Sequence, residues 1–189
     1  DRPWFCLADV VHEDENLAAV ISSGSYVTEG MIVMPCSMKT LAGITAGYAE
    51  NLLVRAADVC LKEGRKVVLV PREMPLGKVH LRNMKEAAEL GCVIIPPVLT
   101  FYNGPKNIEE QINHIVGKIL MQFGITHEKF VRGQEQRMNL EEYHITKASG
   151  SKYQIELLAV FCGPDLSVTI CGGTGYHVGC HRPGGVPDR

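Results

Sequence analysis

Three short apolar runs, each followed by a segment long enough for a helix, constrain the fold of this chain more than any other feature. The runs are Gly30–Val33, Val67–Val70 and Val93–Ile95. Runs of this length are typical of strands buried on both faces, and strands separated by helices pair in parallel through right-handed crossovers. The pattern predicts a three-layer, doubly wound α/β domain with a parallel sheet. The predicted elements are a short helix over 16–24, strands over 30–35, 66–71 and 92–97, and helices over 40–63, 78–90 and 107–123.

Polar and cationic groups follow these strands at one predicted edge of the sheet. Residues 37–40 come after the first strand, Arg72 follows the second, and Tyr102 lies beyond the third. Open α/β sheets bind ligands at the carboxyl ends of their strands, and a helix start offers unpaired N–H groups and partial positive charge to an anion. The sequence therefore predicts a protein that handles a nucleotide or a phosphate.

Composition sets modest bounds on the remaining possibilities. The chain has 189 residues, 46% of them hydrophobic, and a net charge of -2, with nothing that indicates a nucleic acid or a membrane surface as partner. No apolar stretch approaches the length of about 20 residues that is needed to span a bilayer. No signal peptide precedes the first strand, so we expect a cytoplasmic protein. Cys6, Cys36, Cys60 and Cys92 stand in apolar contexts and are expected to be reduced core thiols.

The character of the chain changes after Gly124. Residues 126–144 are polar and predict a linker or helix end, whereas 145–189 predict a small β-rich segment. Within it, 153–160 and 166–170 have strand character and are separated by Gly163-Pro164-Asp165, which predicts a hairpin. A piece of this size is marginal alone, so it packs on the main domain or on a partner, or begins a truncated domain. We divide the chain into domains at 1–125, 126–144 and 145–189.

Residues 8–125 resemble the UbiX/Pad-type flavin prenyltransferases, including the B subunits encoded beside phenolic-acid decarboxylases. The resemblance covers many motifs in the right order. The matching stretches are Ala8–Val11, Ile21–Ser25, Pro35–Ile44, Arg55–Glu63, Val70–Leu76, His80–Met84, Pro96–Pro97, Phe101–Tyr102 and Gln122–Ile125.

This resemblance implies a Rossmann-like flavoprotein fold and a metal-independent transferase. Members of the family join a dimethylallyl group from dimethylallyl phosphate to N5 and C6 of reduced FMN. The product, prenylated FMN, is passed to a UbiD-type aromatic-acid decarboxylase. The members form homo-oligomers, dodecamers built from trimers, with sites between subunits.

The resemblance also assigns roles to particular residues. Breaking an allylic C–O bond without a metal requires cations and hydrogen-bond donors around the departing phosphate. The implied FMN-binding residues are Ser37, Met38, Lys39, Thr40 and Arg72; the implied catalytic residues are Arg55, Lys62 and Arg72; and the implied dimethylallyl phosphate-binding residues are Tyr102, Lys118, Arg55 and Lys62.

The chain departs from the family pattern at its start. The first strand of the family and its Gly-Ser-Gly-Ala-type loop, with a serine and a glutamate thought to assist proton transfer, have no counterpart here. This predicts an N-terminally truncated flavin prenyltransferase. Residues 145–182 are similar to the small D-type subunit associated with hydroxyarylate decarboxylases. The alternative function is therefore a non-catalytic flavin-binding or cofactor-delivery subunit of such a decarboxylase system.

Other candidate groups give weaker predictions. His12 is expected to be solvated in a polar loop, and His80 and His114 are expected to lie in helices without a partner for acid–base chemistry. We expect no metal site, because the cysteines and histidines of the C-terminal segment lack paired C-x-x-C spacing. That set is Cys162, Cys171, His177, Cys180 and His181.

Overall fold

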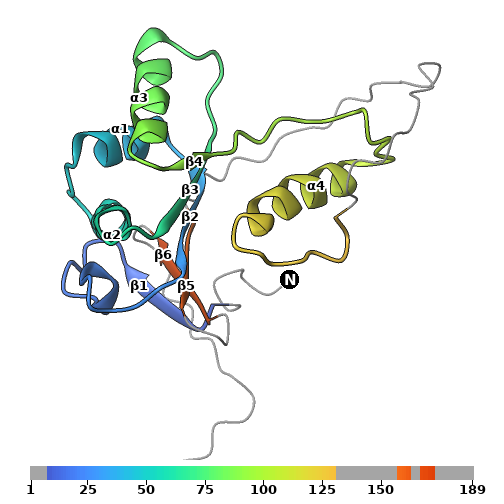
Figure 1. Cartoon of the computed structure of the whole chain (residues 1–189). Helices are drawn as coiled ribbons and strands as arrows, with labels where there is room; N and C mark the ends of the chain where they lie inside the picture. The colour runs from blue at the N-terminus through green and yellow to red at the C-terminus, as the bar shows by residue number, and fades with distance from the viewer. Residues whose placement is uncertain (1–7, 131–156, 163–166, 173–189) are drawn as a thin grey trace, which may run out of the picture.

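A computed structural model describes residues 8–130 and two further strands at 157–162 and 167–172 (Figure 1). The elements in chain order are β1 (Val10–Glu13), the 3-10 helix η2 (Val20–Ser22), β2 (Gly30–Cys36), α1 (Met38–Ala46), α2 (Leu52–Lys62), β3 (Lys66–Pro71), α3 (Lys78–Glu89), β4 (Val93–Ile94), α4 (Ile108–Met121), β5 (Leu157–Cys162) and β6 (Ser167–Gly172).

The strands of the described residues form one sheet in the order β1-β6-β5-β2-β3-β4. The pairs β2–β3, β3–β4 and β1–β6 are parallel. The predicted hairpin strands are present, because β5 and β6 pair antiparallel, and β5 also pairs antiparallel with β2. The predicted turn at 163–165 lies outside the described residues. The C-terminal strands therefore join the main sheet, while the predicted three-way division of the chain stays a prediction.

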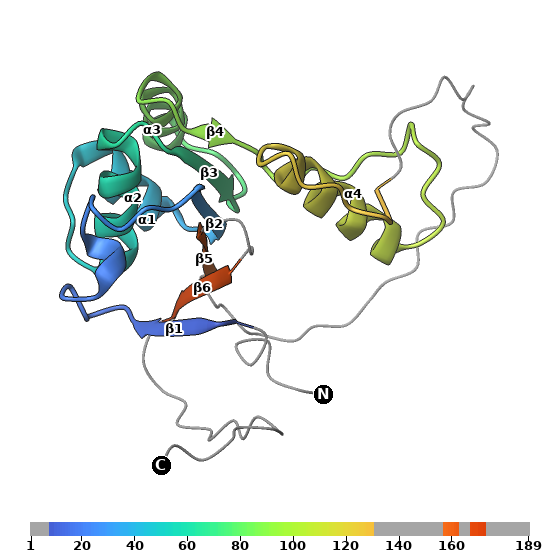
Figure 2. The ribbon, with the colours of Figure 1, turned by 60° about the horizontal axis from the view of Figure 1, so that its bottom comes forward.

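Helices cover both faces of the parallel strands, which confirms the predicted three-layer α/β fold. Figures 1 and 2 show α1, α2 and α3 on one side of β2 and β3, and α4 on the other. Successive strand residues alternate between the two faces. Met31 and Leu69 belong to the core cluster under α1 and α2, whereas Ile32 and Val68 pack with Ile119 of α4. All four strand residues are 5% exposed or less, so the sheet is held firmly on both faces.

The single helix predicted over 40–63 is wrong: the segment forms two helices. Gly47 ends α1 with a φ of 65°, a left-handed conformation that glycine adopts without a steric penalty. Asn51 then caps α2, because its side-chain oxygen accepts a hydrogen bond from the N–H of Val54 at 3.0 Å. The carboxylate of Asp14 accepts another from the N–H of Leu53 at 3.1 Å. These contacts stabilise a second helix start in mid-segment.

Two other predicted boundaries also need correction. The short helix predicted over 16–24 is only the 3-10 turn Val20–Ser22, and the strand predicted over 92–97 is reduced to Val93–Ile94. Strand β4 stops early because Pro96 and Pro97 have no N–H to donate to a neighbouring strand. In contrast, the predicted N-cap of the last helix is confirmed, since Asn107 Oδ1 accepts from the N–H of Glu110 at 2.9 Å.

Cys36, Cys60 and Cys92 are buried in the core, as predicted, whereas Cys6 lies outside the described residues. Over the part of the chain that the structure describes, we find no helix of the length and apolar character needed to cross a membrane.

Candidate functional site

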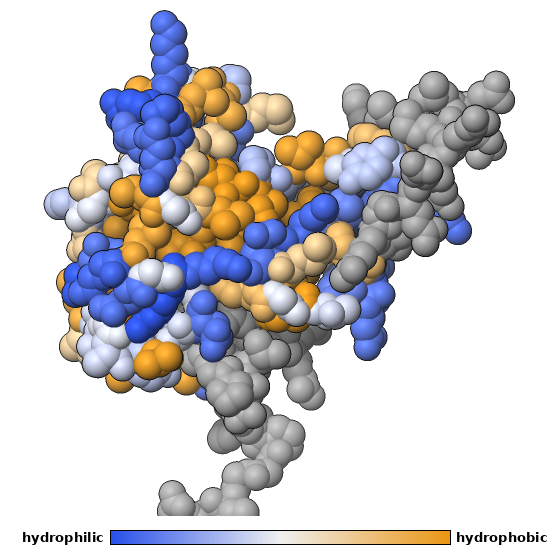
Figure 3. Space-filling model, in the orientation of Figure 1, coloured by the Kyte–Doolittle hydropathy of each residue, from blue (hydrophilic) through white to orange (hydrophobic). Residues whose placement is uncertain are grey.

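A hollow of about 790 Å³ lies at the carboxyl ends of β2, β3 and β4. Small-molecule sites in proteins commonly have this size and occur at this edge of α/β sheets. Its lining residues are Pro35, Ser37, Met38, Pro71, Arg72, Glu73, Met74, Pro96, Pro97, Val98 and Leu99. In Figure 3 apolar surface gathers between α3 and α4 on this face of the molecule. The site thus combines apolar walls with a few polar groups.

Ser37 lies where β2 passes into α1. Its hydroxyl oxygen accepts a hydrogen bond from the N–H of Thr40 at 3.1 Å and lies 3.0 Å from the Thr40 hydroxyl. The carbonyl of Cys36 accepts a hydrogen bond from the N–H of Arg72 at 3.2 Å, which ties the ends of β2 and β3 together. These contacts place the start of α1 next to the backbone of Arg72. A helix start beside a guanidinium group can hold an anion.

The four predicted FMN-binding residues after β2 do not all reach the hollow. Ser37 and Met38 line it, whereas Thr40 is 5% exposed and packs in the core. Lys39 points away, with 80% of its side chain exposed and its ammonium 3.7 Å from Glu50. Arg72 lines the hollow as predicted.

Arg55 and Lys62 lie away from the hollow in this chain. The Arg55 guanidinium donates to the carbonyl of Ser22 at 3.2 Å and to the Asp58 carboxylate at 2.8 Å. Lys62 ends α2, which leads to the amino end of β3, whereas the hollow is at the carboxyl end. Neither residue lines the hollow, so their assigned roles stay predictions.

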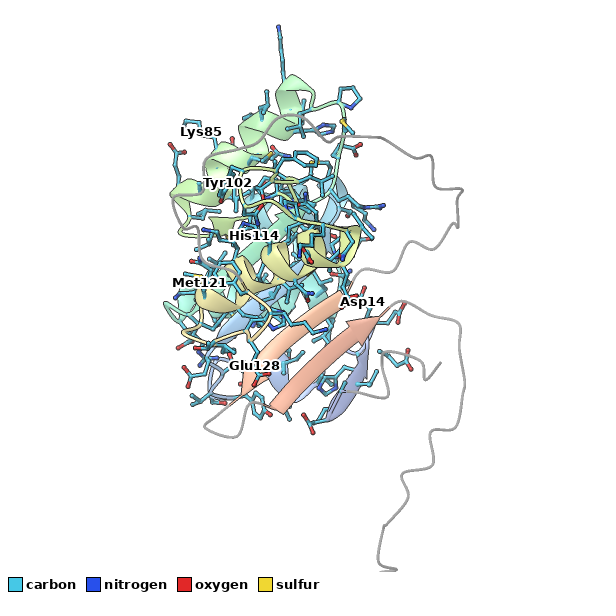
Figure 4. The ribbon with its side chains drawn as sticks, turned by 90° about the vertical axis from the view of Figure 1, so that its right-hand side faces the viewer. Asp14, Lys85, Tyr102, His114, Met121 and Glu128 are labelled. Atoms are coloured by element: carbon cyan, nitrogen blue, oxygen red, sulfur yellow. The ribbon has the colours of Figure 1, made fainter. Side chains whose placement is uncertain are left out.

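Tyr102 and Lys118 belong to a second region, formed by α4 and the loop before it. The Tyr102 ring meets His114 edge-on, with 6.3 Å between ring centroids, and Figure 4 shows these two residues side by side. The Lys118 ammonium lies over the Phe130 ring, 5.9 Å from its centroid. The loop that carries Tyr102 also supplies Pro96–Leu99 to the hollow, so the two regions are connected.

His80 and His114 lie in helices, as predicted, and the structure adds a hydrogen-bond partner for each. His114 has Nδ1 3.3 Å from the Asn103 side-chain nitrogen. His80 Nδ1 accepts from the N–H of Gly77 at 3.1 Å. The prediction for His12 is wrong. His12 lies in β1 and not in a loop, and burial lowers its pKa. Burial, followed by the positive charge of Lys118, lowers the pKa of His114.

Sequence reasoning missed the proline-rich wall of the hollow and the buried polar contacts of α4. The prolines at 96 and 97 indicated where a strand ends, but not what the following loop encloses. Gln111 and His114 stand one turn apart at positions where an amphipathic helix is apolar, and that spacing was the available signal. Across the described residues no group of three His, Cys, Asp or Glu side chains could hold a metal ion. The side chains considered for zinc lie outside the described ones.

The fold and the hollow define an α/β protein with a hollow at the carboxyl edge of a parallel sheet, where proteins of this class bind their ligands. A family model described as Flavoprotein matches residues 3–124. The chain therefore belongs to the flavoprotein family.

Relatives within this family carry more specific names. The chain is 78% identical over 124 residues to a probable UbiX-like flavin prenyltransferase of Sedimentibacter hydroxybenzoicus, covering 66% of each chain. It is 56% identical over 126 residues to one of Escherichia coli O111:H-, covering 67% of this chain and 64% of that protein. The chain thus spans slightly less than two thirds of the length of these curated relatives.

Two solved structures share the fold. One is a dodecameric FMN-dependent UbiX-like decarboxylase from Escherichia coli O157:H7, with a TM-score of 0.68 and 55% identity, covering 69% of this chain and 70% of that one. The other is AnUbiX (PadA1) in complex with FMN and dimethylallyl pyrophosphate. It gives a TM-score of 0.69 at 48% identity and covers 70% of this chain and 71% of that one.

Proposed function

We propose that this chain is a flavin prenyltransferase that moves a dimethylallyl group from dimethylallyl phosphate to reduced FMN. The observation that carries the proposal is the hollow at the ends of β2, β3 and β4, where Ser37, Met38 and Arg72 meet. The family resemblance assigns these residues to flavin binding, and they lie within the segment that the flavoprotein model matches. The names of the relatives support the same reaction.

The residues of the hollow fit FMN in size and chemistry. A hollow of about 790 Å³ falls in the usual range for sites of small molecules and cofactors. The start of α1 and Arg72 supply the hydrogen-bond donors and positive charge that suit a phosphate or an electron-rich ring edge. When bound, reduced FMN supplies the nucleophilic N5 and C6 atoms that accept the prenyl group.

The apolar part of the hollow suits the prenyl donor. Met74, Val98 and Leu99 line it and are all well exposed, so they offer apolar contact to a branched five-carbon chain. Contacts of this kind exclude water and hold the allylic carbon close to its acceptor. The four-residue wall Pro96–Leu99 therefore orients the donor, while cations nearby stabilise the phosphate as it leaves.

The departing phosphate needs more positive charge than Arg72 alone provides. Tyr102 and Lys118 are the proposed donors from the loop and α4. Arg55 and Lys62 do not line the hollow of their own chain, so we propose that they act on the site of a neighbouring subunit in a homo-oligomer. The dodecameric state of the related UbiX-like decarboxylase supports a closed assembly of this kind.

We further propose that prenylated FMN is handed to a UbiD-type aromatic-acid decarboxylase in the cytoplasm. Prenylated FMN carries an additional ring that the transferase itself does not use. An enzyme that consumes the modified flavin must therefore follow, and decarboxylation of aromatic acids is the reaction that the family resemblance implies.

The proposal is tested by anaerobic incubation of the purified chain with reduced FMN and dimethylallyl phosphate, followed by mass spectrometry of the flavin. A mass gain of one prenyl unit is the expected result. FMN that binds without modification would contradict the transferase and support the cofactor-delivery alternative. A parallel reaction with dimethylallyl pyrophosphate identifies the preferred donor, because only the number of phosphate groups differs.

A further inference from the structure

The loop between β4 and α4 is attached to α4 by buried polar side chains. Gln111 and His114 are 4% and 5% exposed, although both carry polar groups. Burying such groups costs free energy unless they are hydrogen-bonded, so their hydrogen-bond partners indicate the structural role of each side chain. In both cases the partner is in the loop.

The contacts form a short chain of hydrogen bonds. Gln111 Oε1 accepts from the N–H of Thr100 at 3.0 Å. The Thr100 hydroxyl donates to Asn103 Oδ1 at 3.3 Å, and the side-chain nitrogen of Asn103 lies 3.3 Å from Nδ1 of His114. Because Asn103 Oδ1 is used as an acceptor, its NH₂ group is the donor toward His114. The imidazole must then be neutral, with its proton on Nε2.

We infer that neutral His114 is a positioning residue that holds the loop 96–107 on α4, and with it both Tyr102 and the Pro96–Leu99 wall of the hollow. Its role in prenyl transfer rests on the proposed function, whereas its role in fixing the loop does not. Tyr102 meets the His114 ring edge-on, and Phe130 packs against the same ring with 5.3 Å between centroids. The imidazole is therefore at the centre of the contact between loop and helix.

Protonation of His114 would break this arrangement. A second N–H at Nδ1 would face the NH₂ group of Asn103, and turning the amide over would remove the acceptor of the Thr100 hydroxyl. The surroundings favour the neutral form, because burial and then the positive charge of Lys118 lower the His114 pKa.

The other titratable groups around His114 are already engaged. Tyr102 from the loop contacts the ring itself. Glu110, one turn earlier on α4, accepts from the N–H of Lys106. From the segment after α4, His127 bonds Asn113 and Lys129 pairs with Glu109. No carboxylate among the contacts of the described residues is thus placed to stabilise a protonated His114.

The test compares His114→Phe, which keeps an aromatic ring but loses the acceptor, with His114→Asn, whose Oδ1 can replace Nδ1. Hydrogen exchange of residues 96–107 is measured in the full chain at pH 7.5. We expect His114→Phe to lose about tenfold in protection at the Thr100 amide, as for one lost hydrogen bond, and His114→Asn to stay within about twofold of wild type. His80→Asn, a matched change on α3, should leave this loop unchanged.

Two further measurements separate positioning from a general loss of stability. In wild type the loop protection should fall as the pH is lowered below about 6.5, and His114→Asn should remove this dependence. Asn103→Ala removes the same hydrogen bond from the loop side, together with the acceptor of the Thr100 hydroxyl, without changing α4, so it reports the effect if His114→Phe fails to fold. Unchanged loop protection in both Asn103→Ala and His114→Phe would overturn the inference, and so would an equal loss in Phe and Asn variants.

Kinetics then connect the loop to the reaction. Where the wild-type chain transfers the prenyl group, His114→Phe should raise the KM for dimethylallyl phosphate about tenfold and change kcat less than about twofold. A fall in kcat alone would contradict positioning of the donor. Where the wild-type chain shows no transfer, the proposed function fails, but hydrogen exchange still decides whether His114 fixes the loop.

Discussion

The two walls of the hollow are built in different ways. The wall formed by Ser37, Pro71 and Arg72 stands at the ends of β2 and β3, whose core residues are almost completely buried. The opposite wall, Pro96–Leu99, belongs to a loop that α4 holds through a few polar contacts. A wall fixed by close packing resists displacement, whereas a wall held by individual hydrogen bonds opens at a lower free energy.

This difference indicates separate tasks for the two walls. The strand ends present the proposed anion-binding groups, which need a fixed geometry to recognise phosphate or a flavin ring. Under the proposed function, the loop wall adjusts when a prenyl donor enters or its product leaves, because each of its hydrogen bonds contributes only about 0.5–1.5 kcal/mol. Substitutions in the two walls should therefore have different consequences.

The largest expected effect comes from the strand wall. Arg72→Ala should reduce prenyl transfer by at least about 100-fold while leaving the fold intact, because it removes a charged donor at the anion-binding edge. Flavin mass spectrometry after single-turnover reactions measures the loss, and circular dichroism checks the fold. Lys85→Ala on the outer surface of α3 is the control. Turnover like that of wild type in Arg72→Ala would refute the assigned site.

Core truncation beneath the strand wall should cost stability. Leu69 is completely buried in β3, so Leu69→Ala should lower the free energy of unfolding by about 2–5 kcal/mol. Leu99 in the loop wall is 48% exposed, and Leu99→Ala should cost less than about 1 kcal/mol. Urea denaturation of both variants provides the comparison. Equal losses would mean that the loop wall is packed as firmly as the sheet.

The sheet side and the loop side should respond to pH in opposite directions. Burial raises the pKa of Cys92, beside β4, from 9.0 to about 11. The unfolded chain therefore ionises first, and stability should fall by up to about 3 kcal/mol as pH rises from 9 to 11. Lowered pKa values have the reverse effect for a base: neutral His114 stabilises the fold above about pH 6.5, and that contribution is lost as pH falls.

Thermal unfolding across pH 5 to 11 checks both slopes, with each residue removed in turn. Cys92→Ala should flatten the alkaline side only, and His114→Asn the acidic side only. If either substitution leaves its own slope unchanged, the titrating group has been wrongly identified.

The smallest effects are expected at the helix starts. Ser37→Ala and Asn107→Ala each remove a side chain that caps a helix, and each should cost about 1 kcal/mol of stability. Only Ser37 lines the hollow, so only its substitution should also weaken FMN binding, as measured by fluorescence titration. An equal loss of FMN affinity in both variants would show that the start of α1 has no special part in the site.

The sequence predicted the strand wall well, because its information is local. Apolar runs set the ends of β2 and β3, and the residue type that follows each run identifies Ser37 and Arg72 as edge residues. The break between α1 and α2 was also encoded locally, in Gly47 and in the capping side chain of Asn51, but a continuous apolar pattern concealed it.

Other features depend on contacts between distant residues and could not be predicted. The pairing of β1 with β6, and of β5 with β2, joins segments that lie far apart in the chain. The contact between Asn103 and His114 could not be predicted, because Asn103 reaches the histidine only after the loop has folded back on α4. The secondary-structure propensities of individual residues carry no information about such long-range contacts.

A crystal structure of the chain with FMN tests the central claim most directly. The account predicts the flavin at the carboxyl ends of β2 and β3, in contact with Ser37, Met38 and Arg72 and facing Pro96–Leu99. Flavin bound elsewhere on the chain, or an empty hollow at saturating FMN, would contradict it.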